Sequence, residues 1–222
     1  AAASAVGHGV DVFVLPGYPA IPEVLRILAG TGVAVGAQDV SPFGDGPYTG
    51  EVSAGMLAEL GAALAETGHA ERRRLFHEDD AVVAAKAAAA LGHGLTPVLC
   101  VGEATRLPPD DAAAEVVAEL GRLVGPRSTR VVAAYEPHWA IGAPQPAPLE
   151  HIRAVTAAMR GTLRAEGDAV LYGGSAGPGL LTALDGSVDG LFLGRFAHDP
   201  AAFAAVLDEA VIYNQRAGTR KN

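Results

Sequence analysis

The feature that most constrains this chain is a regular alternation of short apolar runs with stretches of helical spacing. Stretches such as "IPEVLRILAG", "DDAVVAAKAAAALG", "DDAAAEVVAELGRLV" and "LEHIRAVTAAMRGTLRAEG" have the apolar spacing of helices. The runs rich in Val, Leu and Ala are seven, at residues 10–16, 33–38, 62–67, 95–103, 129–136, 169–174 and 190–194. Strands that are apolar on both faces and alternate with helices predict a parallel sheet.

Two architectures fit this pattern. A doubly wound open sheet can use seven strands, whereas an eight-stranded β/α barrel needs one more. The opening "AAASAVGHGV" looks like the end of a helix whose beginning lies outside this sequence. No Gly-x-Gly-x-x-Gly opens the first βα unit and no Walker-type lysine loop is present, which disfavours nucleotide-binding folds. Because no linker divides the chain, we expect residues 1–222 to form one α/β domain.

Composition narrows the classes of function. Half of the 222 residues are apolar, which suits a packed enzyme and argues against disorder. The net charge of −9 disfavours nucleic acid or an anionic membrane as a partner. Cys100 is the single cysteine, which excludes an internal disulfide and a cysteine-based zinc site. There is no apolar run of ~20 residues and no signal-peptide pattern, so we expect a cytoplasmic protein without a membrane partner.

Polar residues follow the predicted strands at their carboxyl ends. They are Gln38, His69, Glu103, Glu136, the Gly173-Gly174-Ser175 turn and the Gly194-Arg195 pair. In both architectures the carboxyl edge of the sheet carries the active site. We therefore expect these side chains to lie close together.

Several longer motifs, in series and in order, carry a family resemblance. "TGHAERR" at 67–73, "LTPVLCVGE" at 95–103, "AYEPHWAIG" at 134–142 and "LYGGS" at 171–175 closely resemble signatures of the triosephosphate isomerase family. Residues 35–57 resemble its third strand and long dimer-forming loop. The resemblance implies a (β/α)8 TIM barrel, a small phosphorylated sugar as substrate, no cofactor and no metal. It also implies a homodimer formed through the Ser41–Val52 loop.

The same resemblance assigns the two catalytic residues. Glu136 stands at a strand end before Pro137 and matches the family's catalytic base. His69 matches the electrophile, a neutral histidine that hydrogen-bonds the substrate oxygen at a helix N-terminus. Taken alone, the two residues also fit a salt-bridging carboxylate and a structural histidine. Ala70 occupies a position where the family usually has serine, and we expect a modest cost to activity.

Three further charged residues are expected to support the site. In the family, the glutamate at the position of Glu71 pairs with a catalytic lysine, and the arginine at the position of Arg72 supports nearby carboxylates. Otherwise both residues would be charges on an exposed helical turn. Glu103 matches a family glutamate after the fifth strand and is interpreted as structural support, and Cys100 as a small core residue.

Residues 137–147 resemble the family's closing lid, which explains Trp139 and Ile141 in a loop. The family's usual second hinge holds a lysine, and this chain has Pro144-Gln145-Pro146 instead. Backbone N–H groups are expected to bind the substrate phosphate. The candidates are Gly142, Gly173, Gly174, Ser175 and Gly194.

Arg195 stands where the family usually has a second glycine. It either reshapes the phosphate end of the pocket or points to solvent. "GLFLGRFA" at 190–197 and the glutamate in "AETGHAERR" resemble a branch of the family that isomerises four-carbon ketose phosphates.

The asparagine and lysine of the family's first strand are absent. The chain has two lysines, Lys86, expected on a helix surface, and Lys221 near its end. We therefore expect this chain to supply strands two to eight of the barrel, with the first strand and its lysine motif missing. An N-terminal segment outside this sequence is the favoured explanation, and an impaired relative is the alternative.

Three functions stay open. The leading prediction is a triosephosphate isomerase that interconverts dihydroxyacetone phosphate and D-glyceraldehyde 3-phosphate. The second is a tetrulose-phosphate (erythrulose-phosphate) isomerase with the same base and electrophile. The third is a sugar-phosphate-binding relative that is catalytically impaired. A metal-dependent aldolase is disfavoured because no His and carboxylate set shows ligand spacing.

Overall fold

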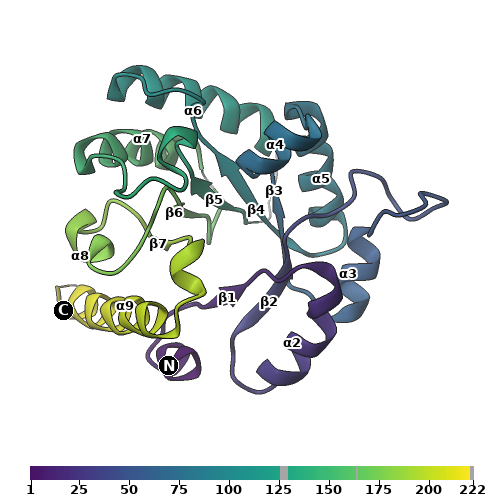
Figure 1. Cartoon of the computed structure of the whole chain (residues 1–222), viewed down its shortest axis with the longest axis horizontal. Coiled ribbons are helices and arrows are strands. Elements are labelled where there is room, and N and C mark those ends of the chain that lie inside the picture. The colour runs from purple at the N-terminus through teal and green to yellow at the C-terminus, as the bar shows by residue number, and fades with distance from the viewer. Residues whose placement is uncertain (126–129, 164, 221–222) are drawn as a thin grey trace.

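The computed structural model describes residues 1–125, 130–163 and 165–220, with side chains described to residue 216. The described strands form one parallel sheet in the sequential order β1 to β7 (Figure 1). They are β1 Phe13–Val14, β2 Ala34–Ala37, β3 Leu64–Thr67, β4 Thr96–Val101, β5 Val132–Tyr135, β6 Ala169–Tyr172 and β7 Gly190–Leu191. The predicted parallel α/β sheet is confirmed.

The strands are shorter than the apolar runs that predicted them. β1 and β7 have two residues each because each pairs with a neighbour on one side only. The start of the fifth run, residue 129, lies outside the described residues. An eighth strand is not seen among the described residues, and the expectation of a missing first strand is not confirmed.

Helices cover the outer face of the sheet (Figure 1). They are α1 Ala2–Gly7, α2 Ile21–Leu28, α3 Ala54–Leu60, α4 Ala70–Phe76, α5 Asp80–Gly92, α6 Pro109–Val124, α7 Leu149–Thr162, α8 Leu180–Leu184 and α9 Pro200–Arg220, with short 3₁₀ turns η1 Tyr18–Ala20, η2 His138–Ala140 and η3 Arg195–Ala197. α1 is the short helix expected at the start, and it packs beside α9. None of the described helices has the length and apolar character needed to cross a bilayer.

Local sequence signals explain where several helices begin. The side chain of Asp79 accepts a hydrogen bond from the backbone N–H of Val82 (2.9 Å) and caps α5. Ser53 caps α3 in the same way, and Gly61 ends that helix in the left-handed conformation (φ 98°). Pro108 and Pro148 directly precede α6 and α7.

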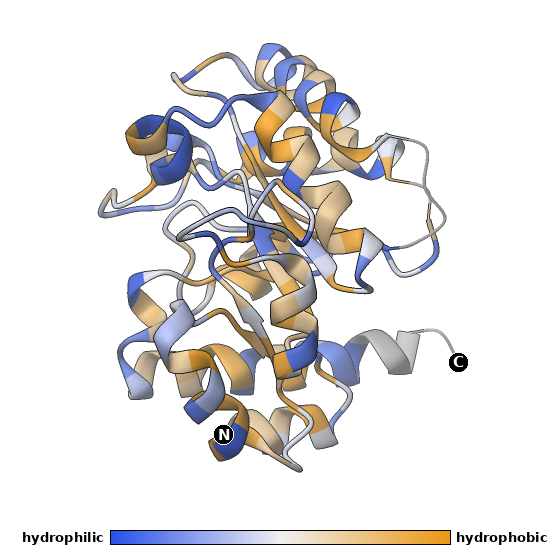
Figure 2. Cartoon of the chain, turned by 90° about the vertical axis from the view of Figure 1, so that its right-hand side faces the viewer, coloured by the Kyte–Doolittle hydropathy of each residue, from blue (hydrophilic) through white to orange (hydrophobic). Residues whose placement is uncertain are grey.

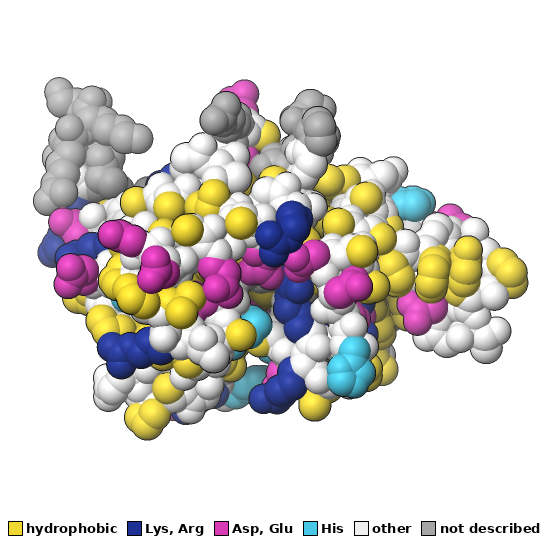
Figure 3. Space-filling model, turned by 90° about the horizontal axis from the view of Figure 1, so that it is seen from above, with side chains coloured by type: hydrophobic (Ala, Val, Ile, Leu, Met, Phe, Trp, Pro, Cys, Tyr) yellow, Lys and Arg dark blue, Asp and Glu magenta, His cyan; other side chains and the backbone are white. Residues whose placement is uncertain are grey.

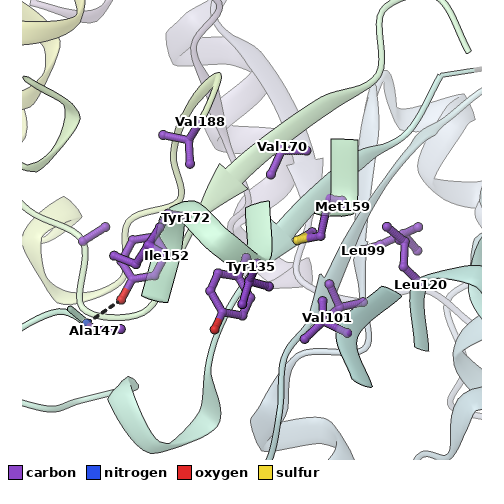
Figure 4. Packing of buried hydrophobic residues seen from close by; sticks show 14 of the residues in the cluster. Leu99, Val101, Leu120, Tyr135, Ala147, Ile152, Met159, Val170, Tyr172 and Val188 are labelled. Atoms are coloured by element: carbon purple, nitrogen blue, oxygen red, sulfur yellow. Dashed lines mark hydrogen bonds between the residues drawn. The ribbon is translucent and has the colours of Figure 1, made fainter. Parts of the chain in front are cut away.

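Successive residues of each strand lie on opposite faces of the sheet. One set, including Leu99, Tyr135 and Tyr172, packs against α5, α6 and α7 (Figure 4). The other set lines the concave inner face and consists of Leu64, Val98, Cys100, Val132, Ala134 and Leu171. Figure 2 shows the strands coloured mainly as hydrophobic, as expected when both faces are covered.

The sheet curls until its two end strands approach each other. The ring of Phe13 in β1 and the ring of Phe192 after β7 are stacked, with centroids 6.2 Å apart. The result is a curled, half-barrel arrangement with the carboxyl ends of the strands at one rim. The loop 41–52, between β2 and α3, projects from the body of the molecule at the right of Figure 1.

Candidate active site

A cavity of about 1640 Å³ opens on the concave side of the sheet and reaches its carboxyl rim. Most predicted site residues line it: His69, Glu71, Arg72, Glu136, Ile141, Gly142, Gly173, Ser175, Gly194 and Arg195. Glu103, Pro137, Trp139 and Gly174 are not among its lining residues. The rim therefore gathers residues from β3, β5, β6 and the turn after β7, as the strand-end pattern predicted.

His69 is held by the start of α4. It is the residue that caps this helix, and its Nδ1 accepts a hydrogen bond from the backbone N–H of Glu71 (3.3 Å). An accepting Nδ1 leaves the Nε2 of a neutral ring as the donor. Nε2 lies 3.8 Å from Oε2 of Glu136. Glu71 lies at the rim, and within the described part of the chain its carboxylate forms no ion pair.

Glu136 follows β5 directly and is 4% exposed. Its Oε2 is buried and has no hydrogen-bond partner among the described residues. Burial raises the pKa of this carboxyl, and the nearby His69 lowers it by a smaller amount. A buried carboxylate with an unsatisfied oxygen is a stronger base than a solvated one, because the charged form is poorly stabilised.

Gly173 forms the wall against which Glu136 rests. A Cβ at this position would lie 2.7 Å from both Cγ and Oε1 of Glu136. The contact explains why glycine stands at this strand end, because any larger residue would displace the carboxylate. Its neighbour Gly174 accepts a hydrogen bond from the Tyr172 hydroxyl (2.5 Å) and helps to fix the turn.

Glu103 lies behind the rim and is completely buried. It accepts hydrogen bonds from the Tyr135 hydroxyl (3.1 Å) and from Nε1 of Trp139 (2.8 Å). Nε2 of His151 lies 2.9 Å from the same carboxylate. The polar edge of Trp139 is thus tied to the protein interior while its ring lies in the 137–147 loop. Glu103 thus contacts the start of the loop, and its supporting role toward the site stays a prediction.

Hydrogen bonds from β6 and from the segments after β6 and β7 also hold the 137–147 loop. The backbone N–H of Ala147 donates to the Tyr172 hydroxyl (2.9 Å), the dashed line in Figure 4. The Ser175 hydroxyl lies 2.8 Å from the carbonyl of Ala140 and 2.9 Å from that of Ala143. Arg195 donates to the carbonyl of Ala143 and, at 3.4 Å, to that of Gly142. Arg195 therefore contacts the loop and does not simply point to solvent.

A second charge cluster lies at the rim near β2. Arg72 contacts Asp39 (3.0 Å) and Glu78 (2.6 Å). Nζ of Lys86 lies 2.6 Å from each of these carboxylates. Lys86 is 2% exposed, so its predicted place on a helix surface is wrong. The helix α5 is apolar on most sides, and a lysine there is buried because two carboxylates pair with it.

The sequence analysis assigned no catalytic or binding role to Glu66. Glu66 lies in β3, is 7% exposed, and lines the same cavity as His69 and Glu136. The thiol of Cys100 contacts its Oε1 (3.6 Å), and burial and the nearby Glu136 and Glu66 all raise the pKa of that thiol. The signal for this position was a single carboxylate inside an otherwise apolar strand run, "LAET".

A histidine and a glutamate that face each other at the carboxyl rim of a curled parallel sheet are the arrangement expected of an acid–base enzyme of the β/α-barrel class. The family model described as triosephosphate isomerase matches residues 1–210. The chain therefore belongs to the triosephosphate isomerase family, which its sequence motifs resemble. It is an enzyme of the aldose–ketose isomerase type.

Three relatives illustrate the similarity. An L-erythrulose-1-phosphate isomerase from Pectobacterium atrosepticum is 48% identical, over 93% of this chain and 83% of the relative. A triosephosphate isomerase from Mycobacteroides abscessus is 42% identical, over 88% of this chain and 81% of the relative. A triosephosphate isomerase from Thermus thermophilus is also 42% identical, over 89% of this chain and 84% of the relative.

Proposed function

We propose that this protein isomerises a phosphorylated four-carbon ketose, of the L-erythrulose 1-phosphate type, through an enediolate. The observation that carries the reaction is the Glu136 carboxylate facing Nε2 of His69 across 3.8 Å in one cavity. The choice of substrate is supported by the 48% identity to an L-erythrulose-1-phosphate isomerase, against 42% for the two triosephosphate isomerases compared with it. Interconversion of dihydroxyacetone phosphate and D-glyceraldehyde 3-phosphate, the leading prediction from sequence, becomes the second candidate.

The proposed reaction moves one proton and needs no oxidant. Glu136 removes a proton from the carbon beside the substrate carbonyl, while Nε2–H of His69 hydrogen-bonds the carbonyl oxygen. The resulting enediolate has negative charge on oxygen, next to the histidine donor. Glu136 then returns the proton to the former carbonyl carbon, and a proton moves between the two oxygens through His69. Substrate and product are isomers, so atoms and charges balance.

The phosphate is proposed to bind at the rim between β6 and β7. Gly142, Gly173, Ser175 and Gly194 line the cavity there. Arg195 adds a positive charge beside Ser175, with Nη2 3.3 Å from Oγ. Phosphate on this side would place the carbons of the substrate between the rim and Glu136. The 137–147 loop, held by Ser175 and Arg195, would keep water from the enediolate.

The family's first-strand lysine has no counterpart in the described strands, which contain neither lysine nor asparagine. Of the cations at the catalytic rim, Arg72 is already paired with Asp39 and Glu78. We assign β1–β7 to strands two to eight of the family's (β/α)8 barrel, because they are parallel, sequential and curled. Sugar-phosphate binding without turnover is the outcome expected of the impaired relative.

We also propose a homodimer formed through the loop 41–52. Phe43 and Tyr48 stack in this loop with ring centroids 4.4 Å apart, and they are 47% and 43% exposed. Figure 3 shows hydrophobic side chains gathered at the tip of the part that projects to the right. An exposed aromatic pair on a projecting loop is typical of a surface that a partner covers.

The test of the reaction is turnover of L-erythrulose 1-phosphate and dihydroxyacetone phosphate in D₂O by the wild type and two variants. Solvent deuterium entering the product at the reacting carbon is expected from an enediolate. Glu136→Asp withdraws the carboxylate by about a bond length and should lower kcat about 100-fold or more. His69→Gln should also lower kcat, because the amide is a weaker and shorter donor.

The matched control is Glu59→Asp, the same change at an exposed position of α3, which should leave kcat unchanged. Full activity of Glu136→Asp would remove Glu136 from the mechanism. Binding of both sugar phosphates without turnover by the wild type would favour the impaired relative.

A further inference from the structure

Glu66 is a carboxyl group in an environment built from apolar residues. It is the only Asp, Glu, Lys or Arg in any described strand. Its neighbours on the inner face of the sheet include Leu64, Val98, Val132 and Leu171. A buried carboxylate in such surroundings costs several kcal/mol of stability unless a cation pairs with it.

The structure gives Glu66 no such cation. Its carboxyl group contacts the thiol of Cys100, at 3.6 Å, and no ion pair to it occurs among the described residues. Two of the other buried glutamates differ in this respect. Glu78 is paired with Arg72 and Lys86, and Glu119 with Arg73. Since Glu66 does not stabilise the fold through a partner, a role in the cavity is the better explanation.

Cys100 in β4 is a neighbour of both Glu66 and the base. The thiol contacts Glu66 in β3, and, in addition to burial, Glu136 after β5 is close enough to raise the pKa of the same thiol. The two carboxyl groups therefore flank one small side chain, and both line the same cavity. Any group attached to the carbon that Glu136 deprotonates would lie within this neighbourhood.

The chemistry of the proposed substrate supplies such a group, and this step rests on the proposed function. L-erythrulose 1-phosphate differs from dihydroxyacetone phosphate by a hydroxymethyl group in place of one hydrogen on the carbon that loses the proton. Its hydroxyl needs a polar partner near Glu136. In the proposed reaction His69 hydrogen-bonds the carbonyl oxygen, and Gly173 has no side chain that could bind the hydroxyl. Glu66 is the charged-type side chain that the described strands place on the inner face, in the same cavity as Glu136.

We propose that Glu66 is a specificity-determining residue that hydrogen-bonds the terminal hydroxyl of a four-carbon substrate and so distinguishes it from a three-carbon one. A neutral carboxylic acid suits this task, because its O–H donates to the hydroxyl oxygen and its C=O accepts from the hydroxyl proton. Burial and the charge of Glu136 raise the pKa of Glu66 to about 8. The acid form of Glu66 thus predominates at neutral pH.

The experiment compares kcat/KM for L-erythrulose 1-phosphate and for dihydroxyacetone phosphate in the wild type, Glu66→Leu and Glu66→Gln. Glu66→Leu should lower the four-carbon to three-carbon ratio of kcat/KM by about tenfold or more, because the hydroxyl loses its partner. Glu66→Gln keeps a donor and an acceptor, so its ratio should stay within about threefold of the wild type. A ratio that is unchanged in Glu66→Leu would overturn the proposal.

The pH dependence of the same ratio separates Glu66 from its neighbours. The titratable groups around it are Glu136, Cys100, Asp39 and Glu71. Ionisation of Glu136 or Cys100 affects the shared chemistry and therefore both substrates. The wild-type ratio should fall as pH rises through 8, when the Glu66 acid loses its donor, and the Glu66→Gln ratio should stay level. A parallel fall in Glu66→Gln would contradict the assignment.

Failure of the proposed function gives a different result. If the wild type turns over neither compound, the reaction is wrong, and calorimetric binding of the same two compounds replaces kcat/KM. A Glu66→Leu variant that lowers the affinity ratio about tenfold would then still support the contact. Equal affinity ratios in the wild type and Glu66→Leu would exclude it.

Discussion

Gly173→Ala tests whether the sheet itself positions the catalytic base. The added Cβ would lie 2.7 Å from Cγ and Oε1 of Glu136 and 3.1 Å from its Cδ. Carbon atoms in contact are normally about 3.5–4.0 Å apart, so the carboxylate must move by roughly 1 Å. A displacement of that size costs about 100-fold in kcat, equivalent to about 2.7 kcal/mol of transition-state stabilisation.

Folding should change little in this variant. The backbone of Gly173 does not have a positive φ, so alanine is compatible with its conformation. The atoms that must move belong to the far end of the Glu136 side chain, which faces the cavity. The melting temperature should therefore shift by less than about 4 °C, the equivalent of about 1 kcal/mol in a chain of this size.

Steady-state kinetics at saturating substrate and thermal unfolding give the two readouts. Gly121→Ala is the matched control, because no atom lies within 4 Å of its added Cβ in α6. That control should keep full activity and gain up to about 1 kcal/mol in helix stability. If Gly173→Ala keeps full activity, Glu136 does not act from the position seen in the structure.

Three further outcomes are expected. Lys86→Met should destabilise the fold by about 3–5 kcal/mol in urea unfolding, because it leaves Asp39 and Glu78 without their shared buried cation; a loss below about 1 kcal/mol would show that Arg72 suffices. Since the folded state raises the pKa of Glu66 from 4.5 to about 8, it binds this proton more tightly than the unfolded state. That contribution to wild-type stability falls as pH rises from about 4.5 to 8, by up to about 1.4 kcal/mol per pH unit. The stability advantage of Glu66→Gln should therefore grow from pH 6 to pH 8, and a constant difference would refute the shift. Replacing Phe43 and Tyr48 together by serine should convert a dimer of twice the 22.5 kDa chain into a monomer in light scattering, while an unchanged mass would exclude the loop as the contact.

The architecture could be predicted from the sequence because its signals are local. Strands apolar on both faces, separated by helical periodicity, specify a parallel sheet whatever the partners of each residue. The carboxyl rim followed from the same reasoning, and His69, Glu136 and Ser175 do lie together there. The long motifs then gave the family, which the matched family model shows. The number of carbon atoms in the substrate was harder to predict from the sequence, because it depends on a few side chains in the cavity.

Contacts between distant segments were the part that the sequence could not give. Lys86 was expected at a helix surface, since its own helix offers no partner for it. Its two carboxylates come from the end of β2 and from the segment before α5. Glu103 likewise meets Trp139 and His151 only after the chain has folded. Periodicity cannot distinguish a buried paired charge from an exposed one.

Lys86 and Glu66 together show how such positions can be interpreted. Both are ionisable residues within apolar runs, and both are buried. Lys86 has two carboxylates at 2.6 Å, so its burial is explained by the ion pairs that it makes. Glu66 contacts a thiol, forms no ion pair among the described residues and faces the cavity. The cost of burying its carboxyl group is therefore not offset by an ion pair. An ionisable residue within an apolar run therefore predicts burial. Whether the fold supplies partners for it, as a counter-charge or as hydrogen-bond donors, then helps to distinguish a structural role from a role toward a ligand.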